Sequence, residues 1–139
     1  MKFKRQTIEI REPRRAHVSD AGYDLFSPYD VTVMPGKCSE RINLGVAFEI
    51  PPGFCGVVSE RSSQGVLGVF TVGNIVDSGY TGWVHVTLVN MGEAEYRVGR
   101  GEKICQIYFS TISTETLEEA EKFNPTDRGE AAHGSTGNL

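Results

Sequence analysis

The chain has 139 residues, with 18 acidic side chains against 14 Lys and Arg, and a formal net charge of −4 at pH 7. This length suits a single domain that buries about two thirds of its unfolded surface. The acidic balance argues against a nucleic-acid partner, because the protein would repel the phosphate backbone. No apolar run approaches the ~20 residues of a membrane-spanning helix, so we expect no membrane partner.

Six basic residues gather near the N-terminus: Lys2, Lys4, Arg5, Arg11, Arg14 and Arg15. They form either a basic patch or, in the interpretation that we favour, charged side chains that solvate an edge strand at Thr7–Ile10.

Short strand patterns then recur along the chain. They cover Val31–Met34, Ile42–Ile50, Phe54–Ser59, Val69–Val72, Trp83–Asn90 and Lys103–Ser110. Gly, Pro and Asn turn signals separate them, which is typical of an all-β sandwich or barrel.

The C-terminal part differs in composition from the rest. Thr114–Phe123 is either helical, with Thr116 and Glu119 at capping-box spacing, or extended. After Asn124 the chain offers little to bury. We therefore predict a β domain over residues 1–123 and, over residues 124–139, a flexible C-terminal arm that becomes ordered when a ligand binds.

The three cysteines, Cys38, Cys55 and Cys105, are odd in number and lack CxxC spacing. This pattern predicts a reduced, intracellular and cytoplasmic protein. Cys105 lies between apolar neighbours, so we expect a small buried side chain without a catalytic role.

Gly73–Trp83 carries a carboxylate, Asp77, and an aromatic ring, Tyr80, just before a strand pattern. We interpret the segment as a hairpin tip, in which Gly79 and Gly82 allow backbone angles that other residues resist. Such a carboxylate can orient a water, and such a ring can cover a sugar or a base.

Two segments have the chemistry to bind phosphate. Arg61-Ser62-Ser63-Gln64-Gly65 combines a guanidinium with two hydroxyls, and is either a phosphate site or a polar turn. Arg128 and Gly134-Ser135-Thr136-Gly137 repeat these groups near the C-terminus.

Two further polar residues each allow two interpretations. Asp24 either binds the hydration shell of Mg²⁺ or caps a turn. Gln106 lies among apolar neighbours, and its amide bonds either to buried backbone or to a ligand.

Five segments together resemble the trimeric dUTPases, in that family's order and over nearly the whole chain. They are Ala21–Leu25, Arg61–Ser63, Val76–Gly82, Gly101–Gln106 and Arg128–Gly137. The resemblance implies a jelly-roll fold and a homotrimer in which three chains build each active site. It also implies hydrolysis of dUTP to dUMP and pyrophosphate by a water that attacks the α-phosphorus, with Mg²⁺ bound to the triphosphate.

The same resemblance implies roles for individual residues. Asp77 activates the water, Tyr80 packs on the deoxyribose, and Asp24 contacts the metal through water. The hairpin that includes Asn74 recognises uracil through its backbone. Phosphates are held by Arg61, Ser62, Ser63 and Gln106, and the γ end is covered by Arg128, Gly134, Ser135 and Thr136.

Two of the departures from the family pattern bear on the recognition of uracil. His133 stands where phenylalanine is usual, and either stacks on uracil or is a solvated loop residue. Asn74 stands where glycine is frequent, and we expect it to tolerate a left-handed backbone.

Two rival functions use the same fold. A dCTP deaminase needs a glutamate where this chain has Thr87, so deamination lacks a proton carrier. A dUTPase-like binding or regulatory protein would use nucleotide occupancy to switch a partner interaction, and obvious insertions, which this chain lacks, would favour it.

Overall fold

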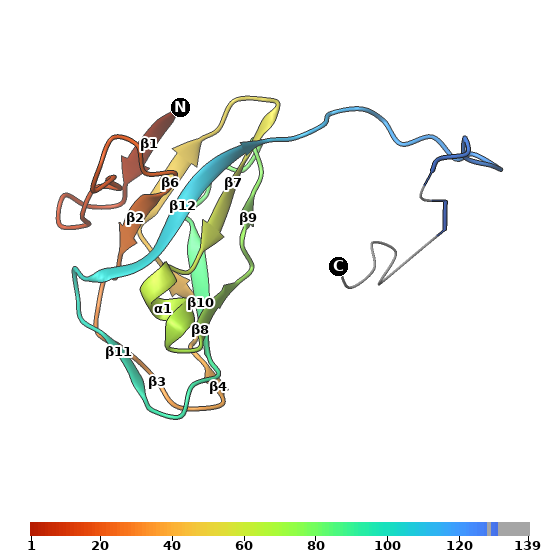
Figure 1. Cartoon of the computed structure of the whole chain (residues 1–139). Helices are drawn as coiled ribbons and strands as arrows, with labels where there is room; N and C mark the ends of the chain where they lie inside the picture. Colours follow the sequence, from red (N-terminus) through yellow and green to blue (C-terminus); the bar gives the residue numbers. More distant parts are fainter. Residues whose placement is uncertain (128, 131–139) are drawn as a thin grey trace.

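Two antiparallel four-stranded sheets form the body of the protein, whose computed structural model describes residues 1–127, 129 and 130 (Figure 1). One has the strand order β2-β12-β7-β9. Its strands are β2 (Tyr23–Phe26), β12 (Lys103–Thr111), β7 (Phe54–Ser59) and β9 (Ile75–Val76). The long β12 pairs with both β2 and β7, so its register sets the position of these two strands relative to each other.

The other sheet is centred on β10 (His85–Asn90), which pairs with three strands. These are β8 (Val69–Val72), β4 (Lys37–Cys38) and β5 (Ile42–Asn43). Two strand pairs complete the fold. They are β3 (Val31–Val33) with β11 (Tyr96–Val98), and β1 (Lys2–Arg5) with β6 (Val46–Glu49).

One hydrophobic core lies between the two layers. Every second residue of β10 is buried, including Val86 and Leu88, and these side chains share a cluster with Ile104 and Ile107 of β12. Burial of aliphatic side chains between two sheets is the main stabilising contribution in such a fold. The all-β class expected from the sequence is confirmed.

Several predicted strands agree closely with the structure. Phe54–Ser59 and Val69–Val72 form β7 and β8 with the expected bounds. The predicted Lys103–Ser110 and Trp83–Asn90 correspond to β12 and β10. Cys105 is fully buried, as expected, and all three cysteines are free.

Three expectations about secondary structure are wrong. Thr7–Ile10 is a turn, closed by a bond from the Ile10 N–H to the Thr7 carbonyl, and the strand lies earlier, at β1. Ile42–Ile50 is interrupted at Gly45, whose φ of 66° ends β5 before β6 begins. Of the two alternatives for Thr114–Phe123, helical and extended, the helical one is wrong.

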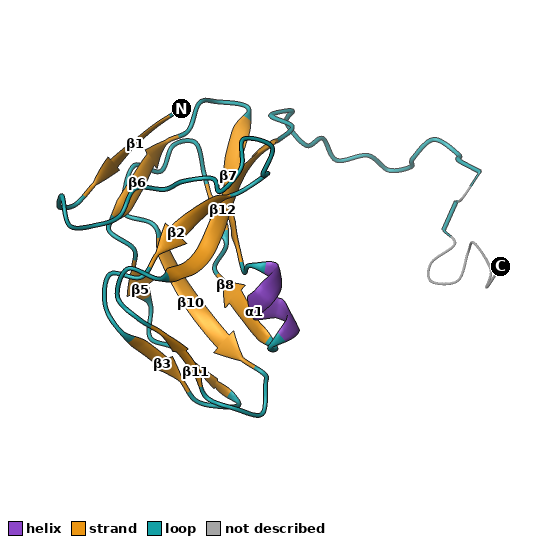
Figure 2. Ribbon diagram, turned by 60° about the vertical axis from the view of Figure 1, so that its left-hand side comes forward, coloured by secondary structure: helices purple, strands orange, loops and turns teal. Residues whose placement is uncertain are grey.

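A short helix, α1 (Ser62–Val66), was not predicted from the sequence; it lies beside β8 (Figures 1 and 2). Within the part of the chain that the structure describes, no helix is long and apolar enough to cross a membrane.

The chain leaves the sandwich after β12, and Figures 1 and 2 show it extending away from the sheets. Residues 112–127 are all exposed and form neither helix nor strand. The predicted boundary between residues 123 and 124 stays a prediction.

Candidate functional site

Asp24, on β2, lies at the centre of a charged cluster with Arg61 and Lys103, called here the Asp24 cluster. Its neighbour Leu25 is buried in the core, so strand alternation turns the Asp24 carboxylate to the opposite side of the sheet. There, Asp24 Oδ2 lies 2.6 Å from Lys103 Nζ, and Asp24 Oδ1 lies 3.4 Å from Arg61 Nε. Its side chain is only 14% exposed, so solvent screens these pairs weakly. Asp24 therefore belongs to a strand and an ion-pair network, and the turn-capping interpretation is wrong.

Lys103 reaches this cluster because of a β-bulge. Lys103 is aligned with Phe26 and Cys105 with Leu25, so Ile104 is the extra residue between them. Both Ile104 and Cys105 are buried, and the side-chain alternation of β12 changes at this point. Without the bulge, Lys103 and Gln106 would face opposite sides of the sheet. With it, both face the side of Asp24.

Gln106 lies opposite Asp24 in the pairing of β12 with β2. Its Nε2 donates to the Glu60 carbonyl at 2.9 Å. Gly22 is required beside it, since a Cβ at Gly22 would lie 2.6 Å from Gln106 Oε1. The Gln106 amide thus bonds to backbone, as one of the two interpretations expected, and its contact with a ligand stays a proposal.

Arg61 is the N-cap of α1, and the buried Gln64 holds it in place. The Arg61 N–H donates to Gln64 Oε1 at 2.9 Å, and Gln64 Nε2 donates to the Ile104 carbonyl at 2.8 Å. These bonds tie α1 to β12 beside Asp24. Ser62 and Ser63 follow in the first turn and are exposed. Gln64 was not predicted as a site residue, although its place three residues after Arg61 is capping-box spacing.

Asp77 and Tyr80 lie together on one tight turn. The Tyr80 N–H donates to the Asp77 carbonyl at 3.0 Å, and the Tyr80 hydroxyl donates to the Trp83 carbonyl at 2.9 Å. Both side chains are exposed. The structure therefore presents a carboxylate and an aromatic ring side by side at the surface, as the sequence predicts.

The glycines of this turn act differently from the prediction. Neither Gly79 nor Gly82 has a positive φ, whereas Gly73 has a φ of 76°. Gly82 is needed for space, because a Cβ there would lie 2.6 Å from the Tyr80 hydroxyl oxygen. The expectation for Asn74 is also wrong, since no described non-glycine residue has a positive φ.

Asn74 is instead tied to the base of the loop. Its Nδ2 donates to the Thr71 carbonyl at 3.3 Å, and the Val58 N–H donates to the Asn74 carbonyl at 2.8 Å. Asn74 Oδ1 is buried and has no hydrogen-bond partner among the residues that the structure describes.

The segment that carries this turn is wider than a simple hairpin. It connects β8 to β10, which pair with each other, but between them it contributes β9 to the edge of the other sheet. Asp77 follows directly after β9 and is thereby anchored beside β7.

The Asp24 cluster and the Asp77 turn are far apart within one chain. β2 and β9 are the two edge strands of the sheet, three strand spacings apart, or roughly 14 Å. The two groups are also displaced along the strands. Asp24 is aligned with Ser59 of β7 by way of Gln106, whereas Val76 is aligned with Gly56 of β7. These three residues along β7 add roughly 10 Å to the separation. One chain therefore does not bring the two groups together around a single phosphate ester.

The remaining predicted residues, Arg128, His133, Gly134, Ser135 and Thr136, lie outside the described residues.

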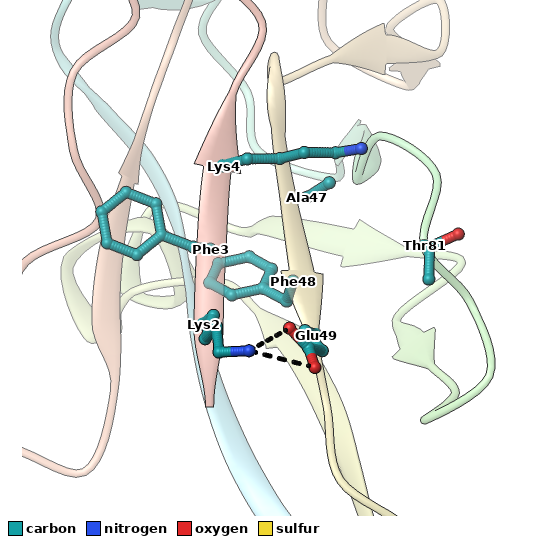
Figure 3. A pocket seen from close by; sticks show the side chains of 7 residues that line it. All are labelled: Lys2, Phe3, Lys4, Ala47, Phe48, Glu49 and Thr81. Atoms are coloured by element: carbon teal, nitrogen blue, oxygen red, sulfur yellow. Dashed lines mark hydrogen bonds and ion pairs between the residues drawn. The ribbon is translucent and has the colours of Figure 1, made fainter.

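An apolar pocket of about 350 Å³ lies between β1, β6 and the loop after Tyr80 (Figure 3). A hydrogen-bonded pair between Lys2 and Glu49 lies at its edge, 3.1 Å apart. No predicted site residue lines it, although Thr81 connects it to the Asp77 turn. We assign it no role in the site.

Comparisons with known proteins identify the family. The family model described as dUTPase matches residues 8–137, which span both the Asp24 cluster and the Asp77 turn. The chain belongs to the dUTPase family. A deoxyuridine 5'-triphosphate nucleotidohydrolase of Monkeypox virus is 33% identical over 137 residues, which cover 99% of this chain and 90% of that protein.

Two solved dUTPase structures share the fold. The Staphylococcus bacteriophage 80alpha dUTPase with dUPNHPP is 28% identical, with a TM-score of 0.89 and coverage of 98% of this chain and 97% of that chain. A mutant dUTPase of phage phi11 of S. aureus, with a structural Mg(II) ion, is 24% identical, with a TM-score of 0.79 and coverage of 88% and 97%. The predicted jelly-roll fold is confirmed by this likeness.

The described residues fit Mg²⁺ only when it arrives with a phosphate ligand. No group of three or more His, Cys, Asp or Glu side chains among them forms a protein-only metal site. Asp24 keeps lone pairs free to accept hydrogen bonds from water, but Arg61 and Lys103 disfavour a free cation beside it. Mg²⁺ commonly binds in this way, through substrate phosphates, retained waters and one or two carboxylates.

Proposed function

We propose that this chain hydrolyses dUTP to dUMP and pyrophosphate. The observation that carries the proposal is the dUTPase family match over residues 8–137, which includes every residue to which the proposal gives a role. The relative from Monkeypox virus bears the name of this activity, and the phage 80alpha structure contains the analogue dUPNHPP.

Asp77 is the general base in this proposal. Its exposed carboxylate accepts a proton from the water that attacks the α-phosphorus, and pyrophosphate leaves. The turn bond from Tyr80 to the Asp77 carbonyl restricts the backbone of Asp77, so its carboxylate can be aimed without large reorganisation. General-base catalysis of this kind contributes about 10²–10⁴-fold to the rate.

The Asp24 cluster and α1 hold the phosphates. Arg61 offers a guanidinium that Asp24 orients, and Ser62 and Ser63 offer exposed hydroxyls next to it. Gln106 completes this surface from β12. Because these groups are already fixed by bonds within the chain, little ordering is needed when the triphosphate binds.

Mg²⁺ bound to the triphosphate would be contacted by Asp24 through water, and its charge would offset the negative charge that builds up on the leaving pyrophosphate. Asp24 would orient those waters, because Lys103 and Arg61 hold its carboxylate in place.

The nucleoside is recognised by the Asp77 turn and by the C-terminal arm. Tyr80 packs on the deoxyribose and excludes a 2′-hydroxyl, and backbone groups near Asn74 bind uracil. His133 stacks on the base, and Arg128 with Gly134, Ser135 and Thr136 covers the γ end. Closure of the arm over residues 124–139 excludes bulk water during the reaction.

The protein acts as a homotrimer with sites shared between chains. The separation of Asp77 from Asp24 within one chain supports this, because a second chain must bring its turn to the first chain's cluster. A third chain contributes the arm. With all three cysteines free, the trimer belongs in a reducing, cytoplasmic compartment.

The two rival functions are not favoured. Thr87 pairs with Val72 at the deaminase glutamate position, and its hydroxyl is a poor proton carrier at neutral pH. A binding protein without turnover has no need of an aspartate at position 77.

The test is to incubate the purified protein with dUTP, dCTP or UTP in the presence of Mg²⁺, and to follow both pyrophosphate and ammonia. We expect pyrophosphate from dUTP alone. Ammonia from dCTP would identify a deaminase, and absence of both products would identify a binding protein.

A further inference from the structure

A basic pocket of about 410 Å³ adjoins the Asp24 cluster and shares Arg61 and Lys103 with it. Its cationic lining residues are Arg11, Arg14, Arg61, Arg97 and Lys103. They come from the N-terminal segment, the start of α1, β11 and β12, so the fold brings together charges that are distant in sequence. The volume lies within the range of small-molecule sites.

Carboxylates only partly neutralise this pocket. Glu102 also lines it, Asp24 pairs with Arg61 and Lys103, and Glu95 pairs with Arg97 at 2.6 Å. Five cations thus face three carboxylates, in a chain whose formal net charge is −4. Among the described residues, neither Arg11 nor Arg14 forms an ion pair.

The N-terminal segment is held in place over the sheet. The backbone of Arg14 exchanges hydrogen bonds with that of Asp24, at 2.9 and 3.3 Å. Arg11 Nη1 donates to the Gly101 carbonyl at 2.6 Å, and its guanidinium stacks on the Phe26 ring at 4.2 Å. These contacts show that Arg11 and Arg14 do not solvate an edge strand, contrary to the interpretation that the sequence favours.

A neutral donor completes the pocket wall. Tyr96 is half-buried beside Arg61, and burial raises the pKa of its phenol, so the hydroxyl stays protonated at neutral pH. Guanidinium groups with a hydroxyl donor suit a ligand rich in phosphate oxygens.

We propose that this basic pocket is an oligophosphate site that extends the phosphate-binding surface beyond Arg61. Its ligand is either free pyrophosphate or the phosphate tail of a bound nucleotide, a choice that rests on the proposed function. Arg14, in the N-terminal segment, and Arg97, on β11, line this pocket but form no ion pair with Asp24. Substituting them therefore tests the pocket separately from the Asp24 cluster.

The test is calorimetry on the full-length protein with three probes: inorganic pyrophosphate, dUPNHPP and dUMP. The variants are Arg14→Gln and Arg97→Gln, and Lys37→Gln on the exposed strand β4 is the charge-matched control. Loss of one charge-assisted contact should weaken pyrophosphate binding about tenfold or more. The control should match wild type, and binding to wild type should weaken as salt rises.

The probes separate the two ligand sources. Weaker binding of pyrophosphate alone in the Arg14 and Arg97 variants supports a site for free pyrophosphate. Weaker binding of dUPNHPP with unchanged dUMP binding supports a site for the nucleotide tail. Binding is read without turnover, so a protein that binds pyrophosphate here but does not hydrolyse dUTP would refute the proposed function only.

Two results would overturn the inference. One is wild-type affinity for pyrophosphate and dUPNHPP in both variants, with unchanged thermal unfolding. The other is pyrophosphate binding that appears only after Glu118 and Glu119 are changed to Gln, because the acidic C-terminal segment would then be the occupant of the pocket.

Discussion

The Asp24 cluster and the Asp77 turn differ in how the chain supports them. Asp24 is 14% exposed and paired with two cations, and Gln64 and Gln106 bind the surrounding backbone. Asp77 is exposed, and within the described residues its side chain forms no hydrogen bond or ion pair. The charged groups of the Asp24 cluster pair with one another, whereas the Asp77 turn presents its carboxylate to solvent.

This difference shows which half of the site one chain can organise alone. The surface that we propose binds phosphate is held together by contacts among β2, β12 and α1, so little entropy would be lost when it is used. The Asp77 carboxylate, which we propose acts on water, has no side-chain partner among the described residues of its own chain. In the proposed mechanism, this carboxylate reaches the ester where another chain supplies the phosphate-binding surface.

Replacing the outward carboxylate should have the largest effect. Asp77→Asn keeps the size of the side chain and removes its basicity, so kcat should fall about 10²–10⁴-fold while dUPNHPP binding is retained. Pyrophosphate release measures kcat, and Asp20→Asn, at an exposed turn elsewhere, is the control. Activity of Asp77→Asn within ~10-fold of wild type would remove Asp77 as the base.

Truncation after Asn124 should have the next largest effect. The Asp24 cluster and the Asp77 turn remain, but the groups proposed to cover the γ end are lost. Loss of one charged hydrogen bond to substrate should reduce kcat/KM about 10–100-fold. Thermal unfolding should be unchanged, because the described residues that are removed, 125–127, 129 and 130, are exposed. Equal turnover by the truncated protein would show that the arm does not close the site.

A pair of glycine variants tests the support of the turn. Gly82→Ala forces the Tyr80 ring to move, since the new Cβ would lie 2.6 Å from its hydroxyl oxygen. Because Tyr80 is exposed, its ring can move without unfolding the turn, and the displacement should appear as a raised KM for dUTP. Gly79→Ala is the matched control, because no atom lies within 4 Å and its φ is not positive. Equal KM values for both variants would mean that the Tyr80 position does not matter.

The smallest effect concerns Cys105, beneath the Asp24 cluster. Burial, and then the nearby Asp24 carboxylate, raise the pKa of its thiol above the ordinary 9.0. The unfolded chain therefore loses this proton as pH passes 9 while the folded chain keeps it, so stability falls with rising pH by up to about 1.4 kcal/mol per pH unit. Denaturant titrations from pH 8 to 10.5 should show a shallower decline for Cys105→Ala. Parallel declines would contradict this account.

The sequence predicts best where alternation and turn residues agree. Phe54–Ser59 and Val69–Val72 are short runs rich in apolar residues, each directly preceded by a glycine, and the bounds of β7 and β8 match the structure. The Asp77 turn was found because its carboxylate, aromatic ring and glycines are adjacent in sequence.

Features that depend on tertiary structure were not predictable in the same way. Lys103 reaches Asp24 only because of the bulge at Ile104, and no residue type in the sequence predicts that bulge. α1 contains a glycine and is too short for a helical period, and tertiary bonds through Gln64 hold it. Arg11 and Arg14 looked like strand surroundings until the fold placed them over β2.

Mixing two inactive variants tests the shared site most directly. Arg61→Ala removes the phosphate half, Asp77→Asn removes the water-activating half, and each alone should be nearly inactive. If each site combines the Asp24 cluster of one chain with the Asp77 turn of another, co-refolded mixed trimers should regain roughly a quarter of wild-type sites by random assembly. Mixed trimers that stay as inactive as the parents would contradict a site shared between chains.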